Sequence, residues 1–216
     1  MDFTLNSKDY MDYIAAVNQE LNEQEEYITN LDLATGDGDH WANLHMGFTK
    51  LTEEKSRLEA LDISSELKEI GKIMMAVIGG SSGVLYGSAY LKAAVVMKGK
   101  DVIHKEELFE ILNAMLNAIM DRGQAKPGYK TMIDSLFPAV MEYKAALEEK
   151  LDVESLCKRV AEAAERGAED TKNMESIKGR ATYQSNKGVG HLDPGAVTMA
   201  LQIKTLMNKA LEKRGA

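Results

Sequence analysis

The sequence predicts an all-helical protein, and three observations lead to this prediction. Only 3 of its 216 residues are proline, the residue that most strongly interrupts helices. Strings such as KEELFEILNAML and KAALEEKLDVESL combine good helix formers with apolar residues at steps of three and four positions. No segment sustains the alternation of apolar and polar residues that is typical of a half-buried strand. We therefore expect helices joined by loops.

The first half of the chain contains four periodic segments. The first begins near Ser7, a residue type that caps helices, and continues to Leu31, where the turn TGDGD ends it. The third stops after Ile78, where the glycines of GGSSG form a common helix end. The four expected helices cover residues 7–31, 43–61, 64–78 and 82–97.

The second half contains four more periodic segments. The sixth includes Pro138, which should kink or break it. The seventh carries the single cysteine, Cys157, near an apolar stripe, where a structural thiol is expected. The eighth opens with Asp193 as N-cap and Pro194 at the first helical position. These expected helices cover residues 105–122, 129–149 and 153–172, and the chain from 193 onward.

Short connections favour antiparallel neighbours, so the expected architecture is a bundle or closed barrel of about eight antiparallel helices. Because no linker, repeat or low-complexity tract interrupts the chain, we expect residues 1–216 to form a single domain. Alternate loops then lie at one end of the molecule. The glycine-rich loops are all alternate connections, and we call the end that they share the glycine-rich rim: TGDGDH, GGSSG, RGQAKPGYK and KGRATYQSNKGVGHLDPG.

The composition excludes several classes of partner. The net charge is -8 and the chain has no basic block, so nucleic acid and anionic membranes are poor candidates. The start of the chain lacks the pattern of a signal peptide, and no segment is apolar for long enough to cross a bilayer. With one cysteine, no internal disulfide can form. We expect a soluble cytoplasmic protein.

Three carboxylates, Asp32, Asp37 and Asp39, lie in and before the first glycine-rich turn. Such hard oxygen ligands suit Mg²⁺, although aspartate and glycine are also common in turns that bind nothing. The turn is not an EF-hand, because Trp41 occupies the next ligand position. For this tryptophan, packing is as good an interpretation as stacking on a base.

The other rim loops are candidates for anion binding. GGSSG can present backbone N–H groups and the hydroxyls of Ser81 and Ser82, although it lacks the ending of a P-loop. Arg180 could pair with a phosphate. An alternative is a hydrolase with Ser81 as nucleophile and His40 or His191 as base, because GGSSG also matches G-x-S-x-G. That motif requires a preceding strand, whereas the sequence before GGSSG predicts a helix.

The stretches GDGDHWAN, GGSSGVLYG, PGYKTMID and KGRATYQSNKGVGHLDPGA, in this order, resemble the nucleotide-binding L subunit of dihydroxyacetone kinases. The resemblance implies a barrel of eight antiparallel helices with ADP or ATP and two Mg²⁺ ions at one rim. It implies that Asp32, Asp37 and Asp39 hold the metal and that Arg180 and His40 are catalytic. The residues that it implies for nucleotide binding are His40, Trp41, Asn43, Ser81, Ser82, Gly123, Met132, Arg180, Asp193, Pro194 and Gly195.

Members of this family pass a phosphoryl group to dihydroxyacetone or a related short ketose that a separate K subunit holds. The resemblance therefore implies a K subunit as partner. It also implies that a phosphohistidine M subunit, supplied by phosphoenolpyruvate, recharges a retained ADP, in preference to exchange with free ATP. A homodimer is a further possible assembly. Two alternatives are an ADP-binding regulatory paralogue that acts with a K-like partner, and a kinase subunit for another ketose such as erythrulose.

The sequence departs from the family pattern at three places on the rim. Trp41 stands where glycine is common, and Tyr129 replaces a common aspartate. The stretch YQSNKG lacks the familiar Gly-Glu-Arg pattern. Each departure bears on how a nucleotide would be held.

Overall fold

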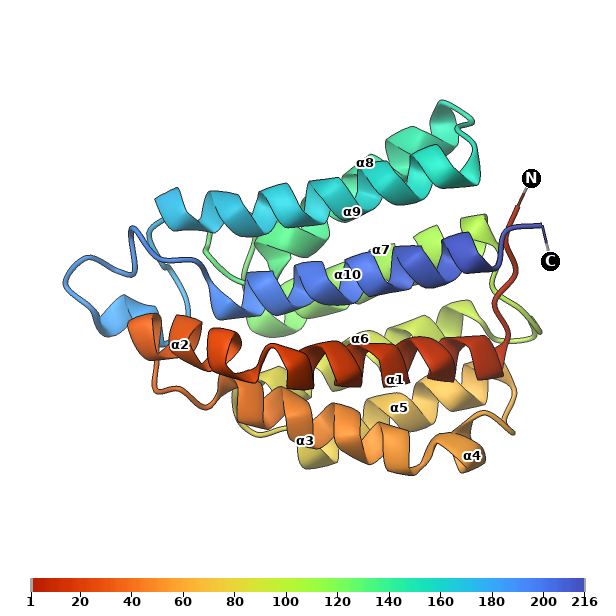
Figure 1. Cartoon of the computed structure of the whole chain (residues 1–216), viewed down its shortest axis with the longest axis horizontal. Coiled ribbons are helices and arrows are strands. Elements are labelled where there is room, and N and C mark those ends of the chain that lie inside the picture. Colours follow the sequence, from red (N-terminus) through yellow and green to blue (C-terminus); the bar gives the residue numbers. More distant parts are fainter. Residues whose placement is uncertain (1, 216) are drawn as a thin grey trace.

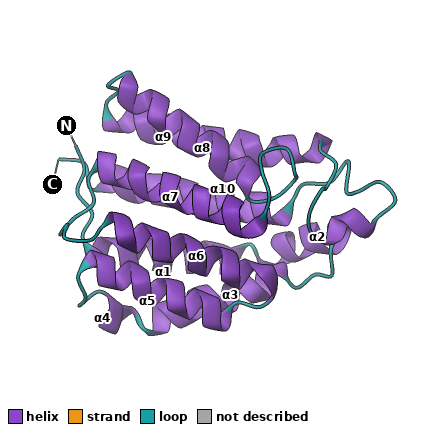
Figure 2. Ribbon diagram, turned by 180° about the vertical axis from the view of Figure 1, so that it is seen from behind, coloured by secondary structure: helices purple, strands orange, loops and turns teal. Residues whose placement is uncertain are grey.

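The computed structural model describes residues 2–215, which form ten α-helices and two short 3-10 helices, η1 and η2 (Figure 1). Within this range the extended segments form only two isolated bridges and no sheet, as Figure 2 also shows. The helices are α1 (Ser7–Glu23), α2 (Glu25–Thr35), α3 (His40–Glu53), α4 (Lys55–Leu58), α5 (Ile63–Val77), α6 (Gly80–Val96), α7 (Lys105–Gly123), α8 (Ile133–Glu148), α9 (Val153–Asp170), η1 (Thr171–Asn173), η2 (Arg180–Tyr183) and α10 (Pro194–Glu212).

Eight long helices close a barrel. The order of contact is α1, α3, α5, α6, α7, α8, α9 and α10, and α10 returns to α1. The interior is filled by apolar and aromatic side chains, among them Tyr10, Tyr86 and Tyr90. The buried thiol of Cys157 belongs to this core. The all-helical fold and its closed antiparallel arrangement are therefore confirmed.

Two of the expected helices are each divided in the structure. The first is interrupted at Gln24, where φ and ψ leave the helical region, and the second is interrupted at Glu54. The stretch around Gln24 is polar and exposed, so no buried face holds it to one axis. The expected cap was also wrong by one residue. Asn6 caps α1 and exchanges hydrogen bonds with Asp9, whereas the Ser7 hydroxyl donates to the Leu61 carbonyl.

Helix α8 differs from the expectation in where it begins. It begins at Ile133 rather than 129, because the Asp134 carboxylate accepts hydrogen bonds from the backbone N–H of Gly128 and Thr131 and holds the chain in a turn. It also runs without a break through Pro138. At this point α9 comes very close, since a Cβ added to Gly167 would lie 2.1 Å from the Asp134 carbonyl oxygen. Glycine thus permits tight packing beside the proline.

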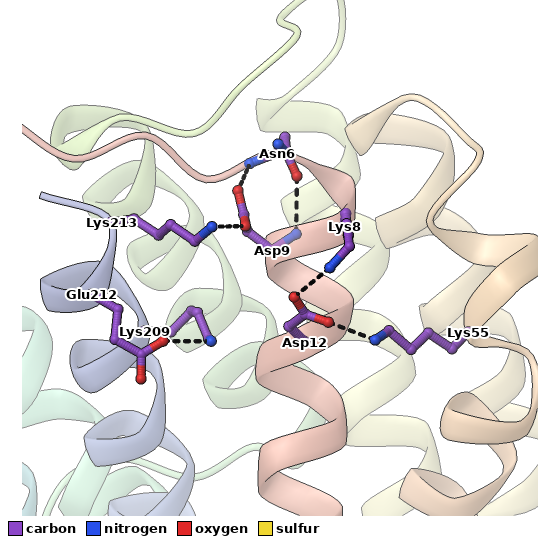
Figure 3. A network of polar contacts seen from close by, with 8 residues as sticks. All are labelled: Asn6, Lys8, Asp9, Asp12, Lys55, Lys209, Glu212 and Lys213. Atoms are coloured by element: carbon purple, nitrogen blue, oxygen red, sulfur yellow. Dashed lines mark hydrogen bonds and ion pairs between the residues drawn. The ribbon is translucent and has the colours of Figure 1, made fainter. Parts of the chain in front are cut away.

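The end of the barrel opposite the glycine-rich rim holds both chain termini (Figure 1). Leu5 and Ile103 exchange two backbone hydrogen bonds there. At the same end, polar side chains connect α1 with the end of α10. The ammonium of Lys213 pairs with the carboxylate of Asp9 at 2.6 Å (Figure 3). No helix within residues 2–215 has the length and apolar character needed to span a membrane.

Candidate functional site

The four glycine-rich loops lie together at the end of the barrel away from the termini (Figures 1 and 2). They surround a cavity of about 570 Å³ to which all four loops contribute. The rim that loop parity predicted is therefore present. Eight of the expected site residues line this cavity: His40, Ser81, Ser82, Gly123, Met132, Asp193, Pro194 and Gly195.

The three expected metal ligands form an acidic cluster beside the cavity. One carboxylate oxygen from each of Asp32, Asp37 and Asp39 lies within 4.8 Å of the others. Asp32 is buried and its Oδ2 accepts a hydrogen bond of 3.0 Å from the His40 backbone N–H. Gly36 leaves room for it, because a Cβ there would lie 2.3 Å from Asp32 Oδ1. This set of hard oxygen donors fits Mg²⁺.

Arg180 lies at the acidic cluster rather than in the cavity wall. Its guanidinium pairs with Asp37 at 2.7 Å, and both side chains are exposed. The short helix η2, which begins at Arg180, holds this residue beside the first glycine-rich turn. An arginine in this position can exchange a carboxylate for a phosphate oxygen, because both ligands accept the same pair of N–H donors.

Two expected nucleotide contacts point elsewhere. The Trp41 indole N–H donates to the Leu21 carbonyl at 2.9 Å, and its ring stacks on His45 with centroids 4.7 Å apart. Asn43 lies beneath the GGSSG loop, where its Oδ1 would be 2.5 Å from a Cβ on Gly79. Neither side chain lines the cavity. In the structure, Trp41 packs on α1 and Asn43 supports the loop.

His40 is held by a residue near the start of α10. Its Nε2 lies 2.9 Å from the Thr198 hydroxyl. Burial lowers the pKa of His40, and the charges of Asp32 and Asp39 oppose this shift. Ser81 is not hydrogen bonded to it and stands in the first turn of α6, which follows helix α5 rather than a strand. The strand required for a hydrolase elbow is therefore missing before Ser81.

The electrostatics of the cavity favour an anion. Helices α3, α6, α8 and α10 all begin at this rim, and helix N-termini carry partial positive charge and, where no side chain caps them, free N–H groups. The N-cap of α6 is Gly79, which has no side chain to occupy those groups. At α10, Asp193 accepts from the Ala196 N–H, and burial raises the pKa of its carboxyl to about 7.

Sequence reasoning missed several residues of the cavity. Arg122, Lys130 and Lys178 add positive charge to its wall. Lys130 falls where the expected loop RGQAKPGYK overlaps the expected helix 129–149, and the preceding proline and glycine favour the loop. Thr198 orients His40 from within α10, and nothing in its local sequence marks that role.

The family model and the known proteins that resemble this chain point to the same family. Residues 34–208 match the DAK2 domain. The chain is 31% identical over 209 residues to the PEP-dependent dihydroxyacetone kinase, ADP-binding subunit DhaL, of Escherichia coli (strain K12), which covers 97% of this chain and 100% of that protein. It is 34% identical over 189 residues to the corresponding DhaL subunit of kinase 1 of Listeria innocua, covering 88% and 89%.

Solved structures agree with this fold. The crystal structure of the dihydroxyacetone kinase from C. freundii in complex with AMP-PNP and Mg²⁺ matches with a TM-score of 0.71 and 27% identity. The match covers 92% of this chain and 33% of that one, so this chain spans about a third of the longer kinase.

Proposed function

Because the chain belongs to the DAK2 domain family, we propose that it is the ADP-binding phosphotransferase subunit of a phosphoenolpyruvate-dependent dihydroxyacetone kinase. The observation that carries the proposal is the junction of the acidic cluster with a cavity of about 570 Å³ at one rim. The acidic cluster suits a divalent cation, and the cavity suits a nucleotide phosphate. The proposal takes residues 1–216 as a single cytoplasmic domain.

Asp32, Asp37 and Asp39 would hold two Mg²⁺ ions. Magnesium, when bound, neutralises charge on the transferring phosphoryl group. The contribution of the protein is to keep the three carboxylates within 4.8 Å of one another before any ion arrives. The buried Asp32 is oriented by the His40 N–H, and Arg180 would leave Asp37 to bind a phosphate oxygen.

The cavity provides separate surfaces for the two halves of a nucleotide. Ser81, Ser82 and the free N–H groups at the start of α6 would receive the phosphates. An apolar wall formed by Leu85, Ile119 and Met132 would hold the base. His40, fixed by Thr198, would position the terminal phosphate. In this arrangement the chain positions and neutralises the phosphoryl group, and the acceptor has to come from outside.

We place the ketose on a K subunit that docks at the same rim, and we assign the recharging of ADP to a phosphohistidine M subunit. Support comes from the exposed apolar side chains of Leu33, Ile177, Tyr183 and Val189, which lie on the segments flanking the acidic cluster. Exposed apolar groups beside a polar site are typical of a protein interface. Dihydroxyacetone is the proposed acceptor, with erythrulose as the alternative ketose.

The experiment is to denature the purified protein and identify released nucleotide by chromatography, before and after exhaustive treatment with EDTA. Retained ADP that leaves only after metal removal is the expected result. Asp37→Ala and Asp39→Ala should each abolish this retention. Normal affinity for Mg-ADP in both variants would contradict the site. A protein that binds ADP but supports no ketose phosphorylation with a cognate K subunit would instead be the regulatory paralogue.

A further inference from the structure

Lys130 is a buried cation at the glycine-rich rim. Its residue is 1% exposed, although lysine is almost never fully buried without a partner. Its backbone has a φ of 60°, the left-handed conformation that residues with a Cβ seldom adopt. A buried charge on an unfavourable backbone indicates that contacts of the side chain hold the residue in place.

The Lys130 ammonium is held by three backbone carbonyl oxygens. Nζ donates to Thr171 at 2.6 Å, to Gly188 at 2.8 Å and to His191 at 2.6 Å. An ammonium has three N–H donors, so these bonds use all of them. The acceptors come from both ends of the segment 171–193 between α9 and α10. One side chain therefore ties the two ends of this long segment together.

No carboxylate neutralises this charge directly. Within residues 2–215 the ion pairs on and beside the segment 171–193 involve Lys172, Arg180 and Lys187 but not Lys130. Burial lowers the pKa of Lys130, and only the more distant charges of Asp193 and Asp134 oppose the shift. The residue also lines the candidate nucleotide cavity. Its N–H groups are occupied, but its positive charge lies close enough to act through space on an anion in that cavity.

We propose that Lys130 is a positioning residue whose ammonium anchors the segment 171–193 over the cavity and is electrically balanced by the phosphates of bound nucleotide. The identity of that ligand rests on the proposed function, whereas the anchoring does not. The segment carries Lys178 and Gly179 on one wall and ends at Asp193 on another. Anchoring both ends at one atom sets the separation of these walls before the ligand binds.

The test compares Lys130→Met with the full-length wild type by hydrogen–deuterium exchange and calorimetry, with and without Mg-ADP. The control is Lys126→Met, which removes an exposed lysine from the same turn. In Lys130→Met we expect amides of residues 174–192 to exchange at least tenfold faster. The Kd for Mg-ADP should rise at least tenfold, and the protection that ADP gives this segment should disappear. Leu5 and Ile103, at the far end, should exchange as in the wild type.

Lys126→Met should match the wild type within twofold in both measurements. Wild-type exchange of residues 174–192 in Lys130→Met would overturn the proposal. Faster exchange with unchanged ADP affinity would overturn the positioning role. If the wild type binds no Mg-ADP, the proposed function fails, while the exchange comparison still decides the anchoring.

A measurement on the wild type needs no variant. In protein labelled with ¹⁵N-lysine, the Lys130 ammonium should give a separate NMR signal, because three hydrogen bonds slow its exchange with water. Exposed lysines lose this signal near neutral pH. Absence of any slowly exchanging ammonium would overturn the proposal even if Lys130→Met fails to fold.

Discussion

Glu66 offers a quantitative test of how burial in the barrel shifts the pKa of a carboxylic acid. It lies in the first turn of α5 with 0% exposure, and neither carboxylate oxygen has a hydrogen-bond partner. The neighbouring Ser7 hydroxyl donates to the Leu61 carbonyl instead, at 2.9 Å. Burial raises the pKa of Glu66 from 4.5 to about 9, and the nearby charges of Glu59 and Asp62 add to the rise. The folded protein therefore keeps this group protonated at neutral pH.

The direction of the pH dependence follows from this shift. Because the pKa is higher in the folded state, the group's contribution to stability is fully present below pH 4.5 and is lost as the pH rises toward 9. Each pH unit in this window corresponds to about 1.4 kcal/mol. Between pH 4.5 and 7.5 the loss is at most about 4 kcal/mol of unfolding free energy.

The perturbation is Glu66→Gln, which has the shape of the protonated acid and cannot ionise. The unfolding free energies of wild type and variant are measured in urea at pH 5, 6, 7 and 8. The variant's value minus the wild-type value should increase by about 1.4 kcal/mol for each pH unit. Glu148→Gln, at a side chain that is 68% exposed, is the matched control and should follow the wild type. Parallel pH profiles for wild type and Glu66→Gln would refute the reasoning.

Three further substitutions test other parts of the structure. Gly167→Ala should lower the unfolding free energy in urea by about 1–3 kcal/mol, because the new Cβ would lie 2.1 Å from a backbone oxygen of α8; an unchanged midpoint would rule out this close approach. Lys213→Met breaks the 2.6 Å ion pair with Asp9 and should cost about 1 kcal/mol. Calorimetry should show unchanged Mg-ADP affinity, since the pair is at the opposite end, and weaker binding would contradict this separation. Trp41→Phe removes an N–H that donates to an α1 carbonyl and should cost about 1 kcal/mol without altering the Kd for Mg-ADP. A raised Kd for Mg-ADP would contradict this and indicate that the Trp41 indole contacts the nucleotide, as the family resemblance implies.

Local sequence was enough to predict the helices and the shared rim. Apolar spacing and residues such as Asp193 and Pro194 act within one or two turns, so they can be read from a short window. The parity of the loops then follows from antiparallel packing. The same locality explains one error. The polar stretch at Gln24 contains no residue that marks a break, so the division between α1 and α2 was not expected.

In the candidate site, too, some residues could be predicted from local sequence and others only from the tertiary structure. Asp32, Asp37 and Asp39 are close in the chain, so their convergence on one point was foreseeable from a short turn. The roles of Trp41 and Lys130 were not, because each depends on backbone carbonyls from distant segments. Hydrogen bonds to backbone oxygens leave no mark in the sequence, since every residue carries the same acceptor. Only the packing of the helices decides which carbonyl a side chain meets, and hence that Trp41 faces α1 while Lys130 anchors the segment beside the cavity.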